Sequence, residues 1–171
     1  MNNIYITKVS NLVDKAKKKG LVKKYSQICQ TSTSKTYMLT ENETHYYIST
    51  QKSTQCNTKK FNIGDIVFVE NYTYKNGQEG QRHILVIISE GAAIDINYFG
   101  FLLFSNMNKT SYPYNEVLKK NDKNNLMKDS IVKCDDLIEI TEEEIKFKIG
   151  TVEPKDLERF INIYEKYIES I

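Results

Sequence analysis

Residues 80–89 read Gly-Gln-Arg-His-Ile-Leu-Val-Ile-Ile-Ser, and this stretch decides the fold. Its centre, from Ile84 to Ile88, is an unbroken apolar run rich in branched side chains. Such a run is typical of a core strand rather than of an amphipathic one. Because Arg82 stands just before the run, the pattern predicts an arginine at the mouth of a buried strand.

The segment that precedes this strand is polar. Residues 71–81 contain two glycines and a single carboxylate, Glu79, and are expected to form a loop. A cation held at the end of a rigid strand beside a polar loop suits a phosphate site. The alternative is that Arg82 merely leaves the core at the strand end and is solvated, and position alone leaves both interpretations open.

The overall composition indicates a cytoplasmic protein of one domain, or of one domain with an appendage. The chain has 171 residues, no apolar run near the roughly 20 residues of a membrane span, and no signal-peptide apolar region at its start. Its three cysteines are far apart and its histidines number two, so neither a disulfide framework nor structural zinc is expected. We therefore expect no metal and no cofactor.

Charge divides the chain at about residue 60. Residues 1–60 carry 11 lysines, no arginine and 3 acidic residues, a net charge of +8, whereas residues 61–171 carry a net charge of −6. A basic end favours nucleic acid or an acidic partner, and the alternative is a solvated surface in a lysine-rich chain.

The basic part, residues 1–60, is predicted to be an N-terminal extension. Apolar residues at helical spacing predict a helix over 8–25, with Ser10 as N-cap and Gly20 as C-cap. A hairpin is expected over 36–50, followed by a linker over 51–60. The extension could widen an RNA-binding surface, pack beside the second domain or bind a partner.

The second part, residues 61–171, is predicted to be an α+β domain. The patterns indicate a Gly-Asp turn followed by a strand within 61–70, further strands over 83–89, 96–105, 116–118, 128–140 and 145–149, and a helix that begins at Pro154. Strands without βαβ alternation favour a small antiparallel barrel or a strongly bent sheet. The apolar stripe of the helix is expected to pack against this sheet; it consists of Leu157, Phe160, Ile161, Tyr164, Ile168 and Ile171.

In this second part the chain resembles the MazF/PemK toxins of bacterial toxin–antitoxin systems. The resemblance covers about residues 61–171 and is carried, in order, by Gly64–Val67, Glu79–Ile87, Leu103–Ser105, Lys128–Val132 and Ile149–Val152. It implies an SH3-like barrel with a C-terminal helix, and a homodimer whose interface groove binds single-stranded RNA. It also implies metal-independent cleavage of RNA, often mRNA, by attack of a ribose 2′-hydroxyl, and an antitoxin protein that occupies the groove.

The resemblance also implies roles for individual residues. Arg82 matches the catalytic arginine, Ser105 matches a position at which a hydroxyl orients the scissile phosphate, and Glu79 matches the loop carboxylate that contacts a base or positions the arginine. The neighbouring loops would supply the RNA contacts, through Tyr74, Lys75, Gln81, His83, Asn106 and Lys109.

Aromatic residues beside lysines in loops suit unstacked bases, which adds Tyr72, Tyr112 and Tyr114 as candidates. The alternative is that tyrosine is simply frequent, since the chain has 12.

Two departures from the family pattern stand out. His83 replaces the usual proline. A histidine beside the site could move protons, but strand alternation favours a side chain that points to the other face of the strand. Residues 135–138 read Asp-Asp-Leu-Ile and lack the arginine expected there. The alternative function is a non-catalytic SH3-like adaptor for nucleic acid or protein, in which Arg82 is structural.

Overall fold

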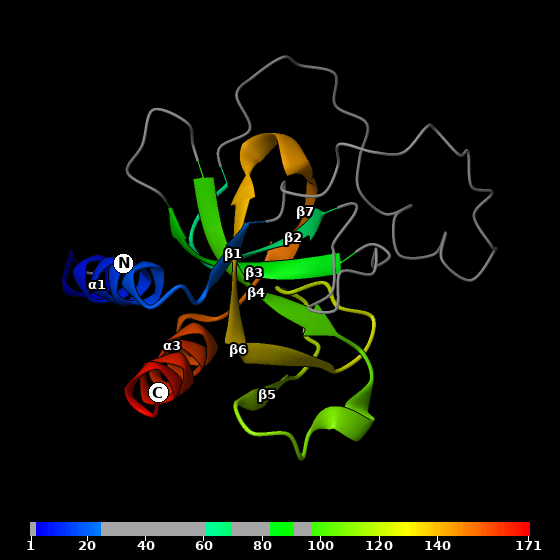
Figure 1. Cartoon of the computed structure of the whole chain (residues 1–171). Coiled ribbons are helices and arrows are strands. Elements are labelled where there is room, and N and C mark those ends of the chain that lie inside the picture. The colour runs from blue at the N-terminus through cyan, green and yellow to red at the C-terminus, as the bar shows by residue number, and fades with distance from the viewer. Residues whose placement is uncertain (1–2, 25–60, 70–82, 91–96) are drawn as a thin grey trace, which may run out of the picture.

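The computed structural model describes residues 3–24, 61–69, 83–90 and 97–171, which form two α-helices and seven strands (Figure 1). The elements in chain order are α1 (Asn3–Lys18), β1 (Val22–Lys24), β2 (Asp65–Val69), β3 (His83–Glu90), β4 (Asn97–Phe104), the 3-10 turn η2 (Met107–Lys109), β5 (Asn115–Leu118), β6 (Ser130–Thr141), the 3-10 turn η3 (Glu142–Glu144), β7 (Ile145–Thr151) and α3 (Pro154–Glu169). The predicted α+β class is confirmed.

The seven strands form a single sheet in the order β1-β6-β4-β3-β2-β7, and β5 also pairs with β6. The pairs are antiparallel, with one exception: β1 runs parallel to β6, with Val22 opposite Leu137. The expected antiparallel sheet therefore carries one parallel strand, which comes from the N-terminal part of the chain.

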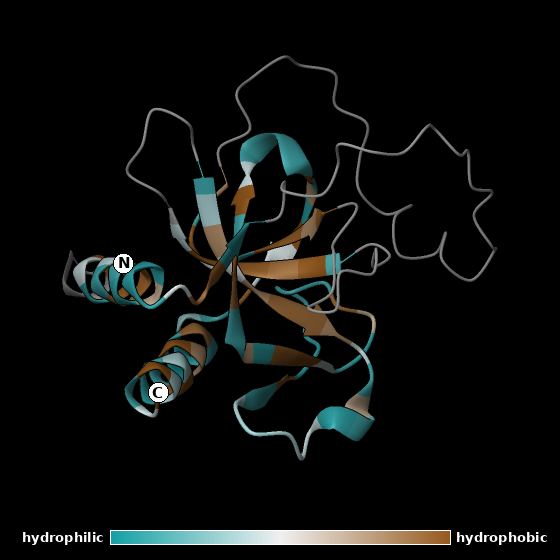
Figure 2. Cartoon of the chain, in the orientation of Figure 1, coloured by the Kyte–Doolittle hydropathy of each residue, from teal (hydrophilic) through white to brown (hydrophobic). Residues whose placement is uncertain are grey.

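Both faces of the sheet are buried. Val86 and Ile88 belong to one apolar cluster, which the two helices cover, and Leu85 and Ile87 belong to a second cluster. Two buried faces explain why residues 84–88 show no polar alternation. Figure 2 shows the resulting concentration of hydrophobic residues in the central strands.

The connection between β6 and β7 requires the sheet to bend. In strand order, β4, β3 and β2 separate these two strands, and a flat sheet would place them about 19 Å apart. The chain has only the four residue steps from Thr141 to Ile145 to join them, a reach of at most about 14 Å. Ile140 of β6 and Ile145 of β7 accordingly share one apolar cluster with Leu85. The sheet is bent as predicted, but in the described part of the chain it is open, because no pairing joins β6 to β7.

Helix α1 differs from its prediction at both ends, although the predicted C-cap, Gly20, is confirmed. It begins at Asn3, so Ser10 is not its N-cap but an exposed residue inside the helix, where serine costs little free energy. At the other end Gly20 has φ +67°, its N–H donates to the Lys17 carbonyl (3.0 Å), and the Leu21 N–H donates to the Ala16 carbonyl (2.9 Å). This Schellman motif ends the helix, and the next residues form β1 instead of continuing to residue 25.

Helix α1 packs on the sheet and lies beside α3 (Figure 1). Its apolar residues Val9, Leu12, Val13 and Ala16 are buried in the same cluster as Phe160 and Tyr164 of α3. Lys8 Nζ lies 2.8 Å from Glu165 Oε2, and Lys19 Nζ donates to the Ile168 carbonyl at 3.0 Å. The N-terminal helix thus packs beside the second part of the chain, whereas the predicted hairpin over 36–50 and the boundary near residue 60 lie outside the described residues.

Helix α3 follows its sequence pattern closely. Pro154 occupies the first turn and Asp156 lies near the positive N-terminal end, as expected. Five members of the apolar stripe are buried, which confirms that this face packs against the sheet. The exception is Ile171, which follows the helix and is 59% exposed. Neither helix in the described ranges is long and apolar enough to cross a membrane.

Candidate functional site

The described residues of the predicted site lie near one edge of the sheet, where β3 starts and β4 ends. Ile84 of β3 pairs with Leu103 of β4, so the start of β3 and the end of β4 lie at the same edge. Ser105 follows β4 directly and is exposed, and Arg82 is the residue directly before β3 in the sequence. Six predicted site residues lie outside the described residues, and their roles stay predictions: Tyr72, Tyr74, Lys75, Glu79, Gln81 and Arg82.

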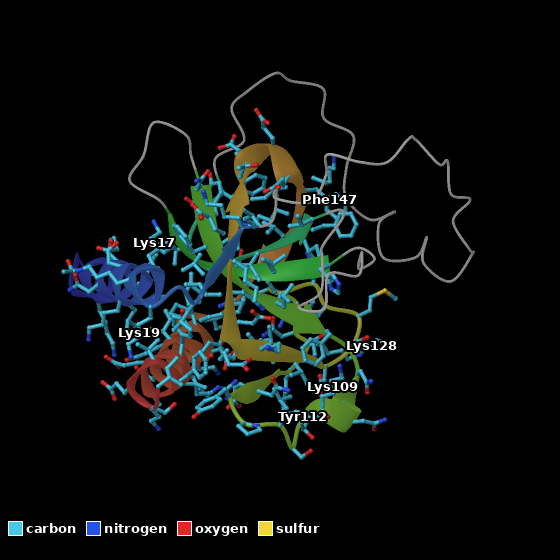
Figure 3. The ribbon with its side chains drawn as sticks, viewed as in Figure 1. Lys17, Lys19, Lys109, Tyr112, Lys128 and Phe147 are labelled. Atoms are coloured by element: carbon cyan, nitrogen blue, oxygen red, sulfur yellow. The ribbon has the colours of Figure 1, made fainter. Side chains whose placement is uncertain are left out.

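The segment after β4 carries Asn106 and Lys109. The Asn106 side chain accepts a hydrogen bond from the Asn108 N–H at 3.1 Å and so caps the turn η2. Lys109 Nζ lies 5.4 Å from the centroid of the half-buried Phe104 ring, a cation–π contact beside the strand end. Figure 3 shows Lys109 and Tyr112 at the lower right of the molecule, whereas Lys17 of α1 and Lys19, which follows this helix, lie at its left. A role of the N-terminal extension in RNA binding stays a prediction.

His83 opens strand β3 and is half buried. It pairs with Val69, which belongs to the second apolar cluster. Because it stands two residues before Leu85, its side chain lies on the same face of the sheet as Leu85, which belongs to that cluster. Burial lowers the pKa of His83 to about 4, so the ring is neutral at pH 7. At pH 7 the His83 ring therefore adds no positive charge to the protein without RNA.

The two described tyrosines of the next turn have different surroundings. Tyr112 is 61% exposed and available to stack on a base. The Tyr114 ring instead packs edge to face on Tyr167 of α3, with centroids 5.1 Å apart, and its hydroxyl lies 3.1 Å from Ser170 Oγ. The side chain of Tyr114 is thus engaged in contacts within the protein. The more exposed Tyr112 is the better candidate for stacking on a base.

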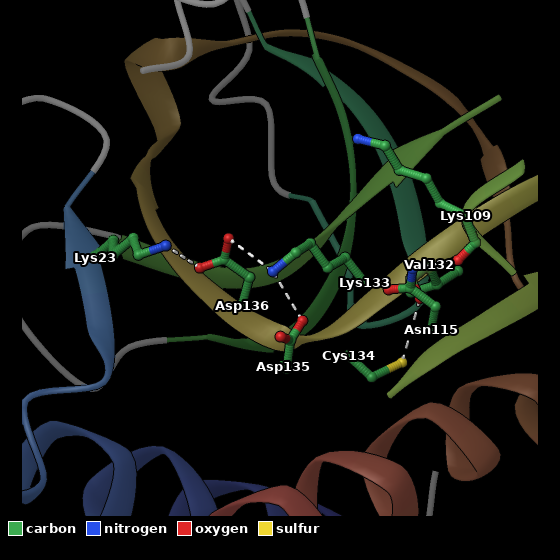
Figure 4. Close-up of polar contacts among 8 residues, drawn as sticks. All are labelled: Lys23, Lys109, Asn115, Val132, Lys133, Cys134, Asp135 and Asp136. Carbon is green, nitrogen blue, oxygen red and sulfur yellow. Dashed lines mark hydrogen bonds and ion pairs between the residues drawn. The ribbon is translucent and has the colours of Figure 1, made fainter. Parts of the chain in front are cut away.

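A polar cluster that sequence reasoning missed lies at a bulge in β6 (Figure 4). Lys133 Nζ bonds Asp135 Oδ1 at 2.8 Å and Asp136 Oδ2 at 3.3 Å, and Lys23 of β1 forms an ion pair with the other oxygen of Asp136. Burial alone would lower the pKa of Lys133, but hydrogen bonds and charges of the two aspartates raise it. The signal in the sequence was the pair Asp135-Asp136, which interrupts an otherwise alternating strand.

Two other reactive groups are structural. The Asp65 carboxylate is buried, lies 2.7 Å from Lys148 Nζ and accepts the Asn62 N–H at 3.0 Å. It stabilises the turn in which Gly64 adopts φ +92°, which explains the Gly-Asp pattern before β2. Cys134 is buried, and burial raises the pKa of its thiol, so it is not an available nucleophile. Among the described residues no three His, Cys, Asp or Glu side chains cluster as metal ligands would.

Comparison with known proteins identifies the family. The model of the PemK-like, MazF-like toxins of type II toxin–antitoxin systems matches residues 62–162, which is more than half of the chain. The chain therefore belongs to this family, as the resemblance in the sequence indicated. The matched region begins after α1 and β1, so these two elements lie outside it.

Two further comparisons add little. Among solved structures, an endoribonuclease from Mycobacterial species is similar at 14% identity with a TM-score of 0.45, covering 67% of this chain and 94% of that one. A similarity this low carries no argument about function. No curated protein matches the chain significantly.

Proposed function

We propose that the chain is a toxin that cleaves single-stranded RNA, with messenger RNA as its substrate in the cytoplasm. Membership of the toxin family supports this proposal. In the same proposal the bent sheet is an SH3-like barrel, two copies form a homodimer whose groove holds the RNA, and a cognate antitoxin protein blocks that groove.

The observation that carries the proposal is the pairing of β3 with β4. Ile84 pairs with Leu103, and Arg82 and Ser105 each stand two residues beyond this pair in the sequence, toward the same edge. A guanidinium and a hydroxyl at one strand edge suit the binding of a phosphodiester, because the planar fork of arginine can hold two phosphoryl oxygens.

The proposed reaction is an intramolecular transesterification of the RNA. The ribose 2′-oxygen attacks the adjacent phosphorus and gives its proton to water, a bond from phosphorus to the 2′-oxygen forms, and the bond to the 5′-oxygen breaks. The leaving 5′-oxygen takes up a proton from water, so the products are a 2′,3′-cyclic phosphate and a 5′-hydroxyl. Arg82 stabilises the negative charge that develops on the phosphoryl oxygens, Ser105 orients the phosphate, and Glu79 holds Arg82 or a base.

The remaining predicted residues bind the strand on either side of the scissile phosphate. Lys75 and Lys109 contact backbone phosphates, and Tyr74 stacks on a base. Gln81, His83 and Asn106 offer neutral hydrogen bonds to bases or sugars.

The test compares two arginine variants on a long single-stranded RNA in excess chelator. The chain has one other arginine, Arg159, which lies in α3 and pairs with Asp156 at 3.1 Å. We expect Arg82→Ala to lower the cleavage rate by about 10²–10³-fold, because charge stabilisation in the transition state is lost, and Arg159→Ala to leave it unchanged.

Equal cleavage by the wild type and Arg82→Ala would contradict the proposed role of Arg82. No cleavage by the wild type, over several unrelated RNA sequences, would favour the non-catalytic adaptor instead.

A further inference from the structure

The segment between β4 and β5 carries three residues of the proposed RNA site but has little burial to hold it in place. Residues 105–113 are all exposed, and η2 contains no buried residue. Its own hydrogen bonds are local: Asn106 caps η2, and Asn115 Nδ2 donates to the Lys109 carbonyl at 2.7 Å. Exposed local bonds alone give little resistance to opening.

The segment ends at a residue in an unusual backbone conformation. Tyr114 has φ +63°, in the left-handed region that bulky side chains rarely adopt. Such a conformation persists only where the surroundings impose it, and it occurs preferentially at functional sites.

The surroundings of Tyr114 do impose it, through three contacts with two elements. Its carbonyl accepts the Cys134 N–H of β6 at 3.0 Å. Its ring packs on Tyr167, and its hydroxyl lies 3.1 Å from Ser170 Oγ, both at the C-terminal end of α3. That helix end is itself anchored, because Lys19, the residue after α1, donates to the Ile168 carbonyl at 3.0 Å.

We propose that Tyr114 is a positioning residue for the RNA site: it fastens residues 105–113 to the end of α3 and so fixes Ser105, Asn106 and Lys109 for substrate. This inference rests on the proposed function. Tyr114 acts through the backbone of the segment, since its own side chain is directed to α3 rather than to the strand edge.

The test uses four variants and two readouts. The variants are Tyr114→Ala, Tyr114→Phe, Ser170→Ala and the double variant Tyr114→Phe/Ser170→Ala. The readouts are amide hydrogen exchange of residues 105–113 against residues 130–141, measured without RNA, and kcat and KM for RNA cleavage.

For Tyr114→Ala we expect exchange in residues 105–113 to accelerate about tenfold or more while residues 130–141 change little, and kcat/KM to fall by a similar factor. Tyr114→Phe and Ser170→Ala each remove the hydrogen bond between these two residues, so each should have a smaller effect of about 2- to 10-fold. Ser170→Ala also removes the bond from Ser170 Oγ to the Tyr167 carbonyl (2.7 Å), so the double variant should resemble Ser170→Ala, because the shared bond is lost only once.

The control is Ile161→Val, which shortens a buried side chain of the same helix that has no part in the Tyr114 contacts. At a temperature well below Tm it should lower stability yet leave kcat/KM and the exchange of residues 105–113 unchanged.

Two results would overturn the proposal: unchanged exchange of residues 105–113 in Tyr114→Ala, or faster exchange in that segment with kcat/KM unaltered. If the wild type cleaves no RNA, the proposed function fails and the positioning role fails with it. The exchange data, which need no substrate, would still decide whether Tyr114 orders the segment.

Discussion

At the scale of single residues, His83 shows how the fold sets the chemistry near the strand edge. A histidine at this position invites a role in proton transfer at neutral pH. Its partial burial against the second apolar cluster lowers its pKa to about 4 and so removes it from that pH range. Lys109 is thus the described cation of this edge, and Arg82, the residue before β3 in the sequence, is its predicted second cation.

This burial makes the stability of the protein depend on pH. Between about pH 6.5 and pH 4 the unfolded chain binds a proton at His83 that the folded chain does not. The free energy of unfolding therefore falls as the pH falls through this window, by about 1 kcal/mol once the partial exposure of the ring is considered. Above the window the effect is absent, and below it no further loss occurs.

The measurement is best made in the His45→Gln background, because His83 is then the only histidine. Its ring resonances should titrate near pH 4, and His83→Gln should flatten the fall in unfolding free energy between pH 6.5 and pH 4. A ring that titrates near 6.5 would contradict the buried position.

At the scale of elements, β1 is the strand whose presence needs most explanation. It is three residues long and pairs in parallel with residues 137–139 of β6. The buried Asp136 carboxylate holds it there through Lys23, and Lys133 supports the same carboxylate. A buried carboxylate that loses one of its cationic partners destabilises the fold.

We therefore expect Lys23→Ala to lower the free energy of unfolding by about 1 kcal/mol, since Lys23 itself is partly exposed. Lys24→Ala is the matched control, because Lys24 is the exposed neighbour in the same strand and should change stability by less than about 0.5 kcal/mol. Urea titrations of the two variants give the comparison. Equal losses would show that the ion pair to Asp136 does not hold β1.

The elements that sequence reasoning predicted well are those with a strong local pattern. The apolar run of β3, the Gly-Asp turn before β2 and the stripe of α3 after Pro154 each follow from periodicity and turn chemistry. The parallel strand β1 did not, because Leu-Val-Lys-Lys after Gly20 continues a helical pattern and only the partner strand decides otherwise. The left-handed Tyr114 also escaped prediction, since tertiary contacts to α3 impose it.

For the site, the sequence predicted the types of residue but not the contacts and burial of their side chains. It put Ser105 at a strand end, where it is found, but could not show that Tyr114 is packed on Tyr167 or that His83 is neutral. Those properties depend on burial, which one local stretch of sequence does not reveal.

At the scale of the whole molecule, the toxin-family region and the N-terminal helix share one core. The family match begins at residue 62, yet Leu12 and Ala16 are buried in the same cluster as Phe160 of α3. Lys8 of α1 also forms an ion pair with Glu165 of α3 and donates a hydrogen bond to the Asn162 side chain. The first role of α1 is therefore to complete the apolar core.

A cavity at Leu12 should consequently destabilise the whole protein. We expect Leu12→Ala to lower the free energy of unfolding by about 2–5 kcal/mol, in the range of large-to-small core substitutions. Ile6→Ala, at a position of α1 that is 46% exposed, should cost less than about 0.5 kcal/mol. Thermal unfolding of both variants would decide the matter, and a harmless Leu12→Ala would mean that α1 is dispensable to the core.

The most direct test of the central claim is the chemistry of the RNA ends. The wild-type protein is incubated in excess chelator with an RNA, and with the same RNA carrying a single 2′-deoxyribose on the 5′ side of the cleaved bond. If the ribose 2′-hydroxyl is the nucleophile, we expect fragments with 2′,3′-cyclic phosphate and 5′-hydroxyl ends, and no cleavage at the 2′-deoxy position. Fragments with 5′-phosphate ends, or cleavage that persists at the 2′-deoxy position, would contradict this mechanism.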